Sequence, residues 1–417
     1  MNTHSTPGMG AEVSRTEEPR VCKVAVIWID WYAYHLARFA GLESAPGLAG
    51  RVAGVELVGG VGVHAGLKFR AERAQGMPVT TLQPEAGWQE ASKLQLAIDL
   101  WKYLSRLQPR VVLVPGYYTL PAIAAAVWAR LHGSTSVLMT ESTADDHARS
   151  WWKEAAKGAL IRTLFEWAVT GGTAHLRYLD QLGFPLDRVA RFYDVVDNRM
   201  LLQGTAHLRA HSSAKEQGIP EGGFLFVGRL APEKNVHGLL TSWLAYRAEG
   251  GTWPLVLAGD GPEGASLRAI AAASKFSGDV YFAGMKNAEE LVAFYSFAGC
   301  FVLPSTREPW GLVVNEAMAA GLPVIVSTRC GSAEDLVASD WNGFVFDPAH
   351  EDELKHVLHR MEQAGVEARR QMGQNSSALI EAYSPEKFGL EIERIASARQ
   401  VAGEVARIAK VRFATGV

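Results

Sequence analysis

The stretch Cys300–Ser327, C-F-V-L-P-S-T-R-E-P-W-G-L-V-V-N-E-A-M-A-A-G-L-P-V-I-V-S, decides the fold of this chain. It begins with an apolar run, Cys300–Pro304, and ends with another, Pro323–Ser327, and a helix-like run lies between them. A strand, a loop, a helix and a second strand form the unit from which parallel sheets are built. The stretch therefore predicts two buried parallel strands joined by a helix.

Two carboxylates occupy the loop and the helix of this unit. Glu308 lies on the loop, Gly311 at the turn, and Glu316 about one turn into the helix. The free N–H groups and the dipole at a helix N-terminus favour an anion. Carboxylates accept hydrogen bonds from hydroxyls. The arrangement suits a ligand that carries both phosphate and hydroxyl groups, such as a sugar nucleotide.

Similar units fill the rest of the chain. Short apolar runs alternate with longer helical patterns, as expected for parallel strands buried on both faces. In the first half these runs are Val24–Ile29, Val52–Val58, Val79–Leu82, Val111–Pro115, Ser136–Thr140 and Trp167–Gly171. In the second half they are Phe224–Val227, Pro254–Ala258, Val280–Ala283, Cys300–Pro304, Pro323–Ser327 and Gly343–Phe346. The pattern predicts an α/β protein with two Rossmann-like domains.

The polar stretch Leu201–Gly223 separates the two halves. We predict a disordered tail at 1–20, a first Rossmann-like domain at 21–205 and a second at 206–390. A C-terminal helix at 391–417 is expected to pack back on the first domain. In such a protein a ligand binds at the carboxyl ends of the strands, in the cleft between the domains.

The composition limits the cellular compartment and the kinds of binding partner that the sequence predicts. The 417 residues are 48% apolar and carry a net charge of −3, which predicts no nucleic-acid partner. Three cysteines, Cys22, Cys300 and Cys330, show no paired spacing, which is typical of a reducing, cytoplasmic protein. The first 20 residues hold no apolar core of a signal peptide, and no apolar run reaches membrane-spanning length.

Residues 226–235, F-V-G-R-L-A-P-E-K-N, place two cations beside a strand end. Gly228 allows a close turn, and Arg229 and Lys234 lie five residues apart near a helix start. A guanidinium fork and an ammonium at these positions suit a diphosphate. The alternative is an ordinary strand–helix connection with two solvated cations.

In two further segments a predicted strand ends at a glycine. In L-A-G-D-G-P, residues 257–262, a tight turn capped by Asp260 is the favoured interpretation. In Y-F-A-G-M-K, residues 281–286, backbone groups of Met285 or Lys286 are placed to contact a base edge. Together with residues 226–235 and 308–316, these segments resemble the retaining glycosyltransferases of family 4, which have the two-domain GT-B fold. The resemblance covers about 224–348.

The resemblance implies roles for the matching residues. Arg229 and Lys234 hold the donor diphosphate near Gly228, and Glu308 contacts the transferred sugar. Glu316 binds the ribose hydroxyls, and Met285 lies near the base. The groups implied to meet the phosphate or the sugar are those of Gly311, Leu312 and Val313.

The transferase chemistry needs a stabilised leaving group. Breaking the sugar–phosphate bond places negative charge on the diphosphate, which cations and a helix N-terminus stabilise. Many transferases use a metal held by Asp-x-Asp for this purpose, and the sequence contains no Asp-x-Asp. We therefore predict no metal and no cofactor. Retention of the anomeric configuration is implied by the family alone.

The first domain departs from the family. Relatives have a Gly-Gly loop after the first strand, whereas this chain has I-D-W-Y-A-Y-H-L-A-R-F, whose Trp31, Tyr32 and Tyr34 are expected to reshape the acceptor side. Relatives place a histidine after the fifth strand, where this chain has Glu141. Glu141 is either a catalytic group that orients sugar or acceptor, or a solvated strand-end residue. His147 is a weaker substrate-binding candidate.

Two other features concern the first domain. Gly171 and Gly172, which follow a strand in A-V-T-G-G-T, allow close backbone approach in the cleft or form a simple turn. The basic, aromatic stretch His147–Trp167 is either a helix that lies on an anionic membrane or a packed helix with one solvated face. The second interpretation is favoured.

The sequence thus predicts a cytoplasmic glycosyltransferase, in possible peripheral contact with the inner membrane face. It moves a sugar from a nucleoside-diphosphate sugar to a hydroxyl of a glycan, a lipid-linked saccharide or a small molecule. Two alternatives stay open: a catalytically silent nucleotide-sugar-binding subunit, and a sugar-nucleotide epimerase of the same fold. The sequence does not decide the nucleobase, the sugar or the acceptor.

Overall fold

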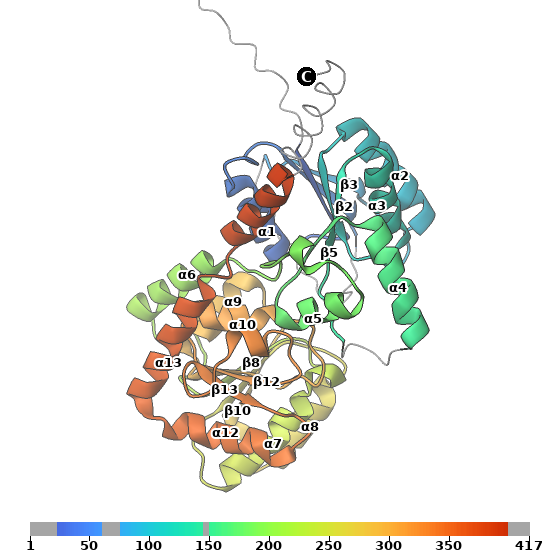
Figure 1. The fold of residues 1–417 in the computed structure, drawn as a ribbon. Coiled ribbons are helices and arrows are strands. Elements are labelled where there is room, and N and C mark those ends of the chain that lie inside the picture. The colour runs from blue at the N-terminus through green and yellow to red at the C-terminus, as the bar shows by residue number, and fades with distance from the viewer. Residues whose placement is uncertain (1–22, 61–75, 145–149, 399–417) are drawn as a thin grey trace, which may run out of the picture.

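The computed structural model describes residues 23–60, 76–144 and 150–398, which form two α/β domains stacked end to end (Figure 1). The predicted tail at 1–20, the candidate His147 and residues 399–417 lie outside the described residues. Each domain has a parallel sheet whose inner strands are buried, which explains their continuous apolar sequences, whereas the edge strands at residues 79–83 and 280–284 are partly exposed. The predicted pair of Rossmann-like domains is confirmed.

The first domain contains a seven-stranded parallel sheet in the order β3-β2-β1-β4-β5-β6-β7. Its strands are β1 (Val24–Trp28), β2 (Val52–Val58), β3 (Val79–Gln83), β4 (Val111–Pro115), β5 (Thr135–Met139), β6 (Trp167–Val169) and β7 (Val189–Ala190). Six of them match the predicted runs, and the two-residue β7 was not predicted. The strand order reverses between β1 and β4, which is the switch point where ligands of such folds bind.

The second domain repeats this arrangement with six strands in the order β10-β9-β8-β11-β12-β13. The strands are β8 (Phe224–Val227), β9 (Leu255–Ala258), β10 (Val280–Gly284), β11 (Cys300–Leu303), β12 (Val324–Ser327) and β13 (Gly343–Phe346). All six coincide with predicted runs. Here the order reverses between β8 and β11, so the loops that follow these two strands are neighbours.

Helices cover both faces of each sheet (Figure 1). In the first domain they are α1 (Ala33–Ser44), α2 (Lys93–Leu107), α3 (Leu120–Leu131), α4 (Trp151–Leu164) and α5 (Thr173–Gln181). The chain continues with α6 (Asn198–His211), α7 (Val236–Ala248), α8 (Gly264–Ala273), α9 (Ala288–Phe297), α10 (Leu312–Ala319), α11 (Ala333–Leu336), α12 (Glu351–Gln363) and α13 (Gly365–Ile380). Among the described residues no helix is long and apolar enough to cross a bilayer.

The chain crosses between the domains twice. Helix α6 packs against α9 and α10 of the second domain, so the predicted boundary at 205/206 falls inside a helix. The last described helix, residues 385–398, returns to the first domain beside α1 (Figure 1). There the carboxylate of Glu393 accepts a hydrogen bond from Gly47 N at 2.5 Å.

Direct contacts also join the domains near the cleft. The N–H and hydroxyl of Thr173, at the start of α5, donate to the Asp335 carboxylate on α11, each at 2.7 Å. His175 is fully buried, and its Nδ1 accepts from Gly172 N at 3.1 Å. The other ring nitrogen, Nε2, therefore carries the proton and donates to Pro309 O at 3.0 Å. These bonds hold the loop before α10 against the first domain.

Candidate active site

The two strands at the switch point of the second domain bring Lys234 and Glu308 together. Lys234 lies in a 3-10 turn, Pro232–Lys234, after β8, and Glu308 lies on the loop after β11. The Lys234 ammonium forms a hydrogen-bonded ion pair with Glu308 Oε2. Ser305 Oγ also donates to Glu308 Oε2, at 3.3 Å. A fixed, half-buried cation thus lies beside a carboxylate, 74 residues away in the sequence.

Arg229 and Gly228 follow β8 at the same edge of the sheet. The Arg229 side chain is exposed, so its guanidinium is accessible to a ligand. Gly228 has φ +152° and packs against Gly259, which has φ +153°. A Cβ on Gly259 would lie 1.8 Å from Gly228 O. The two backbones therefore approach too closely for any side chain, and the loop that carries Arg229 is held in place.

The N-terminus of α10 faces the same region. Gly311 has φ +92°, in the region that favours glycine, and its carbonyl accepts the first helical hydrogen bond, from Val314 N at 2.8 Å. The next residues, Leu312 and Val313, are only half-buried. Their N–H groups lie in the first helical turn and are suited to bind an anion.

Glu316 lies on α10 and accepts a hydrogen bond from Tyr295 Oη at 2.8 Å. Burial raises the pKa of Glu316 to about 7, and the Tyr295 hydrogen bond opposes this shift. The carboxyl therefore changes charge near neutral pH. Its ionised form accepts hydrogen bonds from hydroxyls more strongly than its neutral form.

We expect Glu316→Gln to stabilise the protein at pH 8 but not at pH 5. The folded state binds this proton more tightly than the unfolded state, so wild-type stability falls as pH rises from about 4.5 towards about 7. Removal of the carboxyl avoids this cost, which is on the order of 1–3 kcal/mol. Thermal unfolding of both proteins at the two pH values measures it. An equal difference in Tm at both pH values would contradict this account.

Met285 follows β10, two strands away from β8 at the same carboxyl edge. It is half-buried and comes directly after Gly284, whose φ is +70°. Met285 therefore lies after the edge strand of the sheet, on the same carboxyl side as Lys234 and Glu308. Its expected contact with a base stays a prediction.

In the first domain Glu141 follows β5, at the carboxyl end of the sheet. Its side chain is 41% exposed, and its Oε1 lies 4.0 Å from Nη1 of the buried Arg38. Glu141 is thus a partly exposed strand-end residue that lies near a buried guanidinium. Asp194 is the second carboxyl beside Arg38 and is fully buried.

Gly171 and Gly172 lie where the two domains touch. A Cβ on Gly171 would be 2.2 Å from Asp194 Oδ2 and 3.0 Å from the Trp310 ring. A Cβ on Gly172 would be 2.2 Å from Asp335 Oδ2 and 2.6 Å from the same ring. Both positions thus require glycine for close approach across the domain interface.

The aromatic residues after β1 were assigned wrongly in part. Trp31 is 1% exposed and packs on Phe39, and Tyr32 is 7% exposed. These two side chains belong to the core of the first domain and do not reshape the acceptor side. The sequence misled because a loop position does not show which way a large side chain turns.

The described residues contain no group of three or more His, Cys, Asp or Glu able to hold a metal ion.

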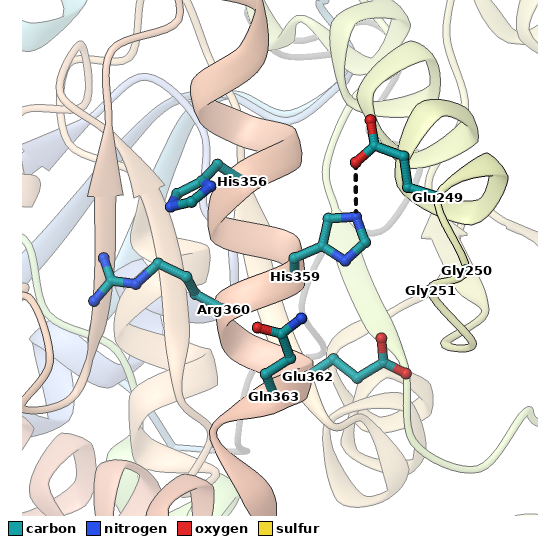
Figure 2. Close-up of a pocket in the computed structure, with 8 residues that line it drawn as sticks. All are labelled: Glu249, Gly250, Gly251, His356, His359, Arg360, Glu362 and Gln363. Atoms are coloured by element: carbon teal, nitrogen blue, oxygen red, sulfur yellow. Dashed lines mark hydrogen bonds and ion pairs between the residues drawn. The ribbon is translucent and has the colours of Figure 1, made fainter.

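A polar pocket of about 540 Å³ lies away from the candidate site, between the end of α7 and α12 (Figure 2). Its lining includes Glu249 and His359, whose Oε2 and Nε2 are 3.2 Å apart. Since α7 starts near the carboxyl end of β8, its far end lies at the opposite edge of the sheet. This pocket is therefore separate from the Lys234–Glu308 region.

Comparison with known proteins places this geometry in a family. Residues 213–378 match the sequence model of the glycosyl transferases group 1. These residues contain β8 to β13 and all the second-domain candidates described above. The second domain is thus similar to this family. The Lys234–Glu308 pair therefore lies in a segment that is similar to the group 1 glycosyltransferases.

Curated relatives of this group 1 domain include two proteins named GDP-mannose-dependent alpha-mannosyltransferase. The one from Mycobacterium tuberculosis is 28% identical over 62% of this chain and 59% of its own length. The one from Mycolicibacterium smegmatis is 35% identical over 35% of this chain and 37% of its own length. The chain thus matches little more than half of the first relative and about a third of the second.

Solved structures share the whole fold. Anabaena HepE in complex with UDP covers 90% of this chain and all of its own length, with a TM-score of 0.67 and 17% identity. Sucrose-phosphate synthase from Thermosynechococcus elongatus covers 91% of this chain and 99% of its own length, with a TM-score of 0.66 and 17% identity. The architecture is the GT-B fold.

Sequence reasoning missed four residues near the candidate site: Arg38, Asp194, Tyr295 and Asn315. Asn315 lies inside the opening stretch, one turn after Gly311, and a polar residue in an apolar helix was a usable signal. Its Nδ2 donates to Asp194 O at 2.9 Å, across the domain interface. The other three lie in separate segments, which do not indicate that these residues meet in the fold.

Proposed function

We propose that this protein is a glycosyltransferase that moves a sugar from a nucleoside-diphosphate sugar to an acceptor hydroxyl. One observation carries the proposal: in a group 1 domain, the Lys234–Glu308 pair lies at the strand ends that face the N-terminus of α10. The donor binds the second domain and the acceptor binds the first, with the cleft between them. Closure of the cleft would exclude water that hydrolyses the donor.

The proposed roles follow from the charges. Arg229 and Lys234 neutralise the diphosphate as its charge grows, and the N–H groups of α10 assist them. Glu308 accepts hydrogen bonds from the transferred sugar, and Glu316 from the ribose. We propose that transfer proceeds without a metal, because Arg229, Lys234 and the helix N-terminus supply the positive charge. We also propose retention, which only the resemblance to family 4 implies.

Nucleoside diphosphate release tests the proposal directly. Purified protein is incubated with GDP-mannose first, because two relatives are named for it, and then with UDP- and ADP-sugars. Release that depends on an added glycan or lipid acceptor supports transfer. Binding with no release supports a silent binding subunit, and interconversion of the donor sugar with no release supports an epimerase. If no donor binds, the proposal is wrong.

We also propose that the protein works in the cytoplasm, at the inner face of a membrane. The buried free thiols Cys300 and Cys330 suit a reducing compartment. Helix α4 turns Ile161 and Leu164 inward, but it exposes 83% of Trp151 and 56% of Trp152. An exposed apolar, basic face of this kind suits an anionic membrane surface.

We expect the wild-type protein to float with anionic liposomes at low salt and less at high salt, because the attraction is partly electrostatic. The double variant Trp151→Ser/Trp152→Ser should lose most of this binding. Exposed Leu202→Ser, in α6, is the matched control and should float like the wild type. No flotation of the wild-type protein at low salt would end the membrane proposal.

A further inference from the structure

A buried guanidinium lies beside Glu141 in the first domain. Arg38, on α1, is 0% exposed, and its Nη2 donates to Oδ1 of the equally buried Asp194 at 3.2 Å. Its Nη1 lies 4.0 Å from Glu141 Oε1, whose side chain is 41% exposed. One cation is therefore shared between a carboxyl sealed inside the domain and a carboxyl open to the cleft.

Aromatic rings hold this guanidinium in place. It lies over the Tyr193 ring, 4.1 Å from the centroid, and 5.0 Å from the centroid of Tyr34. Trp28 Nε1 donates to Tyr193 Oη at 3.2 Å and so fixes the ring. An arginine cannot release its proton in such a place, so the charge is permanent and its position is set.

The buried pair does not use its full hydrogen-bonding capacity. Nε and Nη1 of Arg38 and Oδ2 of Asp194 have no hydrogen-bond partner among the described residues. A buried ion pair with unused donors is weak as a stabilising device, because desolvation offsets its attraction. The 4.0 Å contact between Arg38 and Glu141 indicates that the pair serves to position Glu141.

The pair also connects to the donor side. The Asp194 carbonyl accepts from Asn315 Nδ2 at 2.9 Å, and Asn315 Oδ1 accepts from Trp310 Nε1 at 2.9 Å. Trp310 and Asn315 flank Gly311, where α10 begins. Arg38 and Asp194 thus lie between Glu141 and the loop that carries Glu308.

We propose that Arg38 and Asp194 are positioning residues, which hold the Glu141 carboxylate where it accepts a hydrogen bond from the attacking hydroxyl. The inference rests on the proposed transferase function. A fixed guanidinium attracts a nearby carboxylate and restricts where it lies.

Burial acts on the other titratable groups of the cluster. Burial, followed by the charge of Glu141, raises the pKa of Asp194, and Arg38 opposes the shift. Burial also raises the pKa values of Tyr34, Tyr193 and the more exposed Tyr118, and the carboxyl of Asp30 faces Tyr34. Arg38 is therefore the fixed positive charge that the two carboxyls share.

A double-mutant cycle tests the proposal. Arg38→Gln and Glu141→Gln should each lower kcat by roughly 10- to 100-fold, because both remove one ionised group. The KM for the donor should change by less than about twofold, since the donor binds the other domain. The double variant should be no slower than the slower single variant, because Arg38 acts through Glu141. Effects that multiply would overturn the proposal.

Two further variants exclude a folding artefact. Arg38→Gln/Asp194→Asn neutralises both buried partners, so it leaves no unpaired charge and should fold, as circular dichroism would show. Its kcat should match that of Arg38→Gln, and a wild-type kcat would overturn the proposal. Asp335→Asn, the matched control, removes another buried carboxylate that pairs with an arginine, Arg191. Its effect should multiply with that of Glu141→Gln.

Assays of the wild-type protein distinguish a failure of the positioning role from a failure of the proposed transferase function. If it transfers sugar but the effects of the cycle multiply, only the positioning role fails. If it binds no nucleotide sugar, the proposed function fails and the inference fails with it.

Discussion

Lys234→Ala is expected to lower kcat for sugar transfer by roughly 100- to 1,000-fold, the usual cost of removing one preorganised charge partner of a transition state. The diphosphate leaving group gains negative charge as the sugar departs, and Lys234 is the half-buried cation fixed at the end of β8. The helical content should stay unchanged. Initial rates with saturating donor, and circular dichroism, measure both.

Two controls make this result specific. Lys215→Ala removes an exposed lysine of the second domain and should leave kcat unchanged. Lys234→Ala/Glu308→Gln removes the cation without leaving the Glu308 carboxylate unpaired, and it should be no faster than Lys234→Ala. If Lys234→Ala keeps a third or more of the wild-type kcat, Lys234 does not stabilise the leaving group.

Gly259→Ala is expected to destabilise the second domain by about 3 kcal/mol or more. The new methyl group would lie 1.8 Å from Gly228 O. That carbonyl cannot retreat, because Gly228 N bonds to Ala258 O at 3.0 Å and Leu230 N to Asp260 O at 2.9 Å. The expected result is a lower midpoint of thermal unfolding and a weaker affinity for the donor.

Gly250→Ala separates steric clash from backbone strain. Gly250 has φ +98°, but a Cβ there would have no atom within 4 Å. This variant should lose only about 1–2 kcal/mol, the cost of placing alanine at positive φ. Equal losses for the two variants would show that close packing of Gly228 and Gly259 is not what requires glycine.

The fold could be predicted because buried parallel strands are continuous in the sequence. Every strand of the second domain, from β8 to β13, coincides with an apolar run between helical patterns. In the first domain β7 was missed, since Val189–Ala190 is too short to form a run. Its place at the edge of the sheet follows from pairing with β6, which depends on tertiary structure.

The site could be predicted in part. The sequence indicated the two residues separately. Lys234 was found from a strand that ends at a glycine, and Glu308 from the loop before a helix. Their ion pair depends on β8 and β11 being neighbours, which the order of strands along the chain does not give. Arg38 and Asp194 are 156 residues apart and read as ordinary polar residues. Only the structure shows that they share one buried position.

Isothermal titration of nucleotide sugars tests the central claim most directly, because it needs no acceptor. GDP-mannose, UDP-glucose and ADP-glucose are titrated into the wild-type protein and into Lys234→Ala, with chelator present. The account predicts one-to-one binding of at least one donor at micromolar Kd, roughly −7 to −8 kcal/mol, and a loss of at least about tenfold in Lys234→Ala. No binding of any donor below millimolar concentration, or equal binding by both proteins, would contradict it.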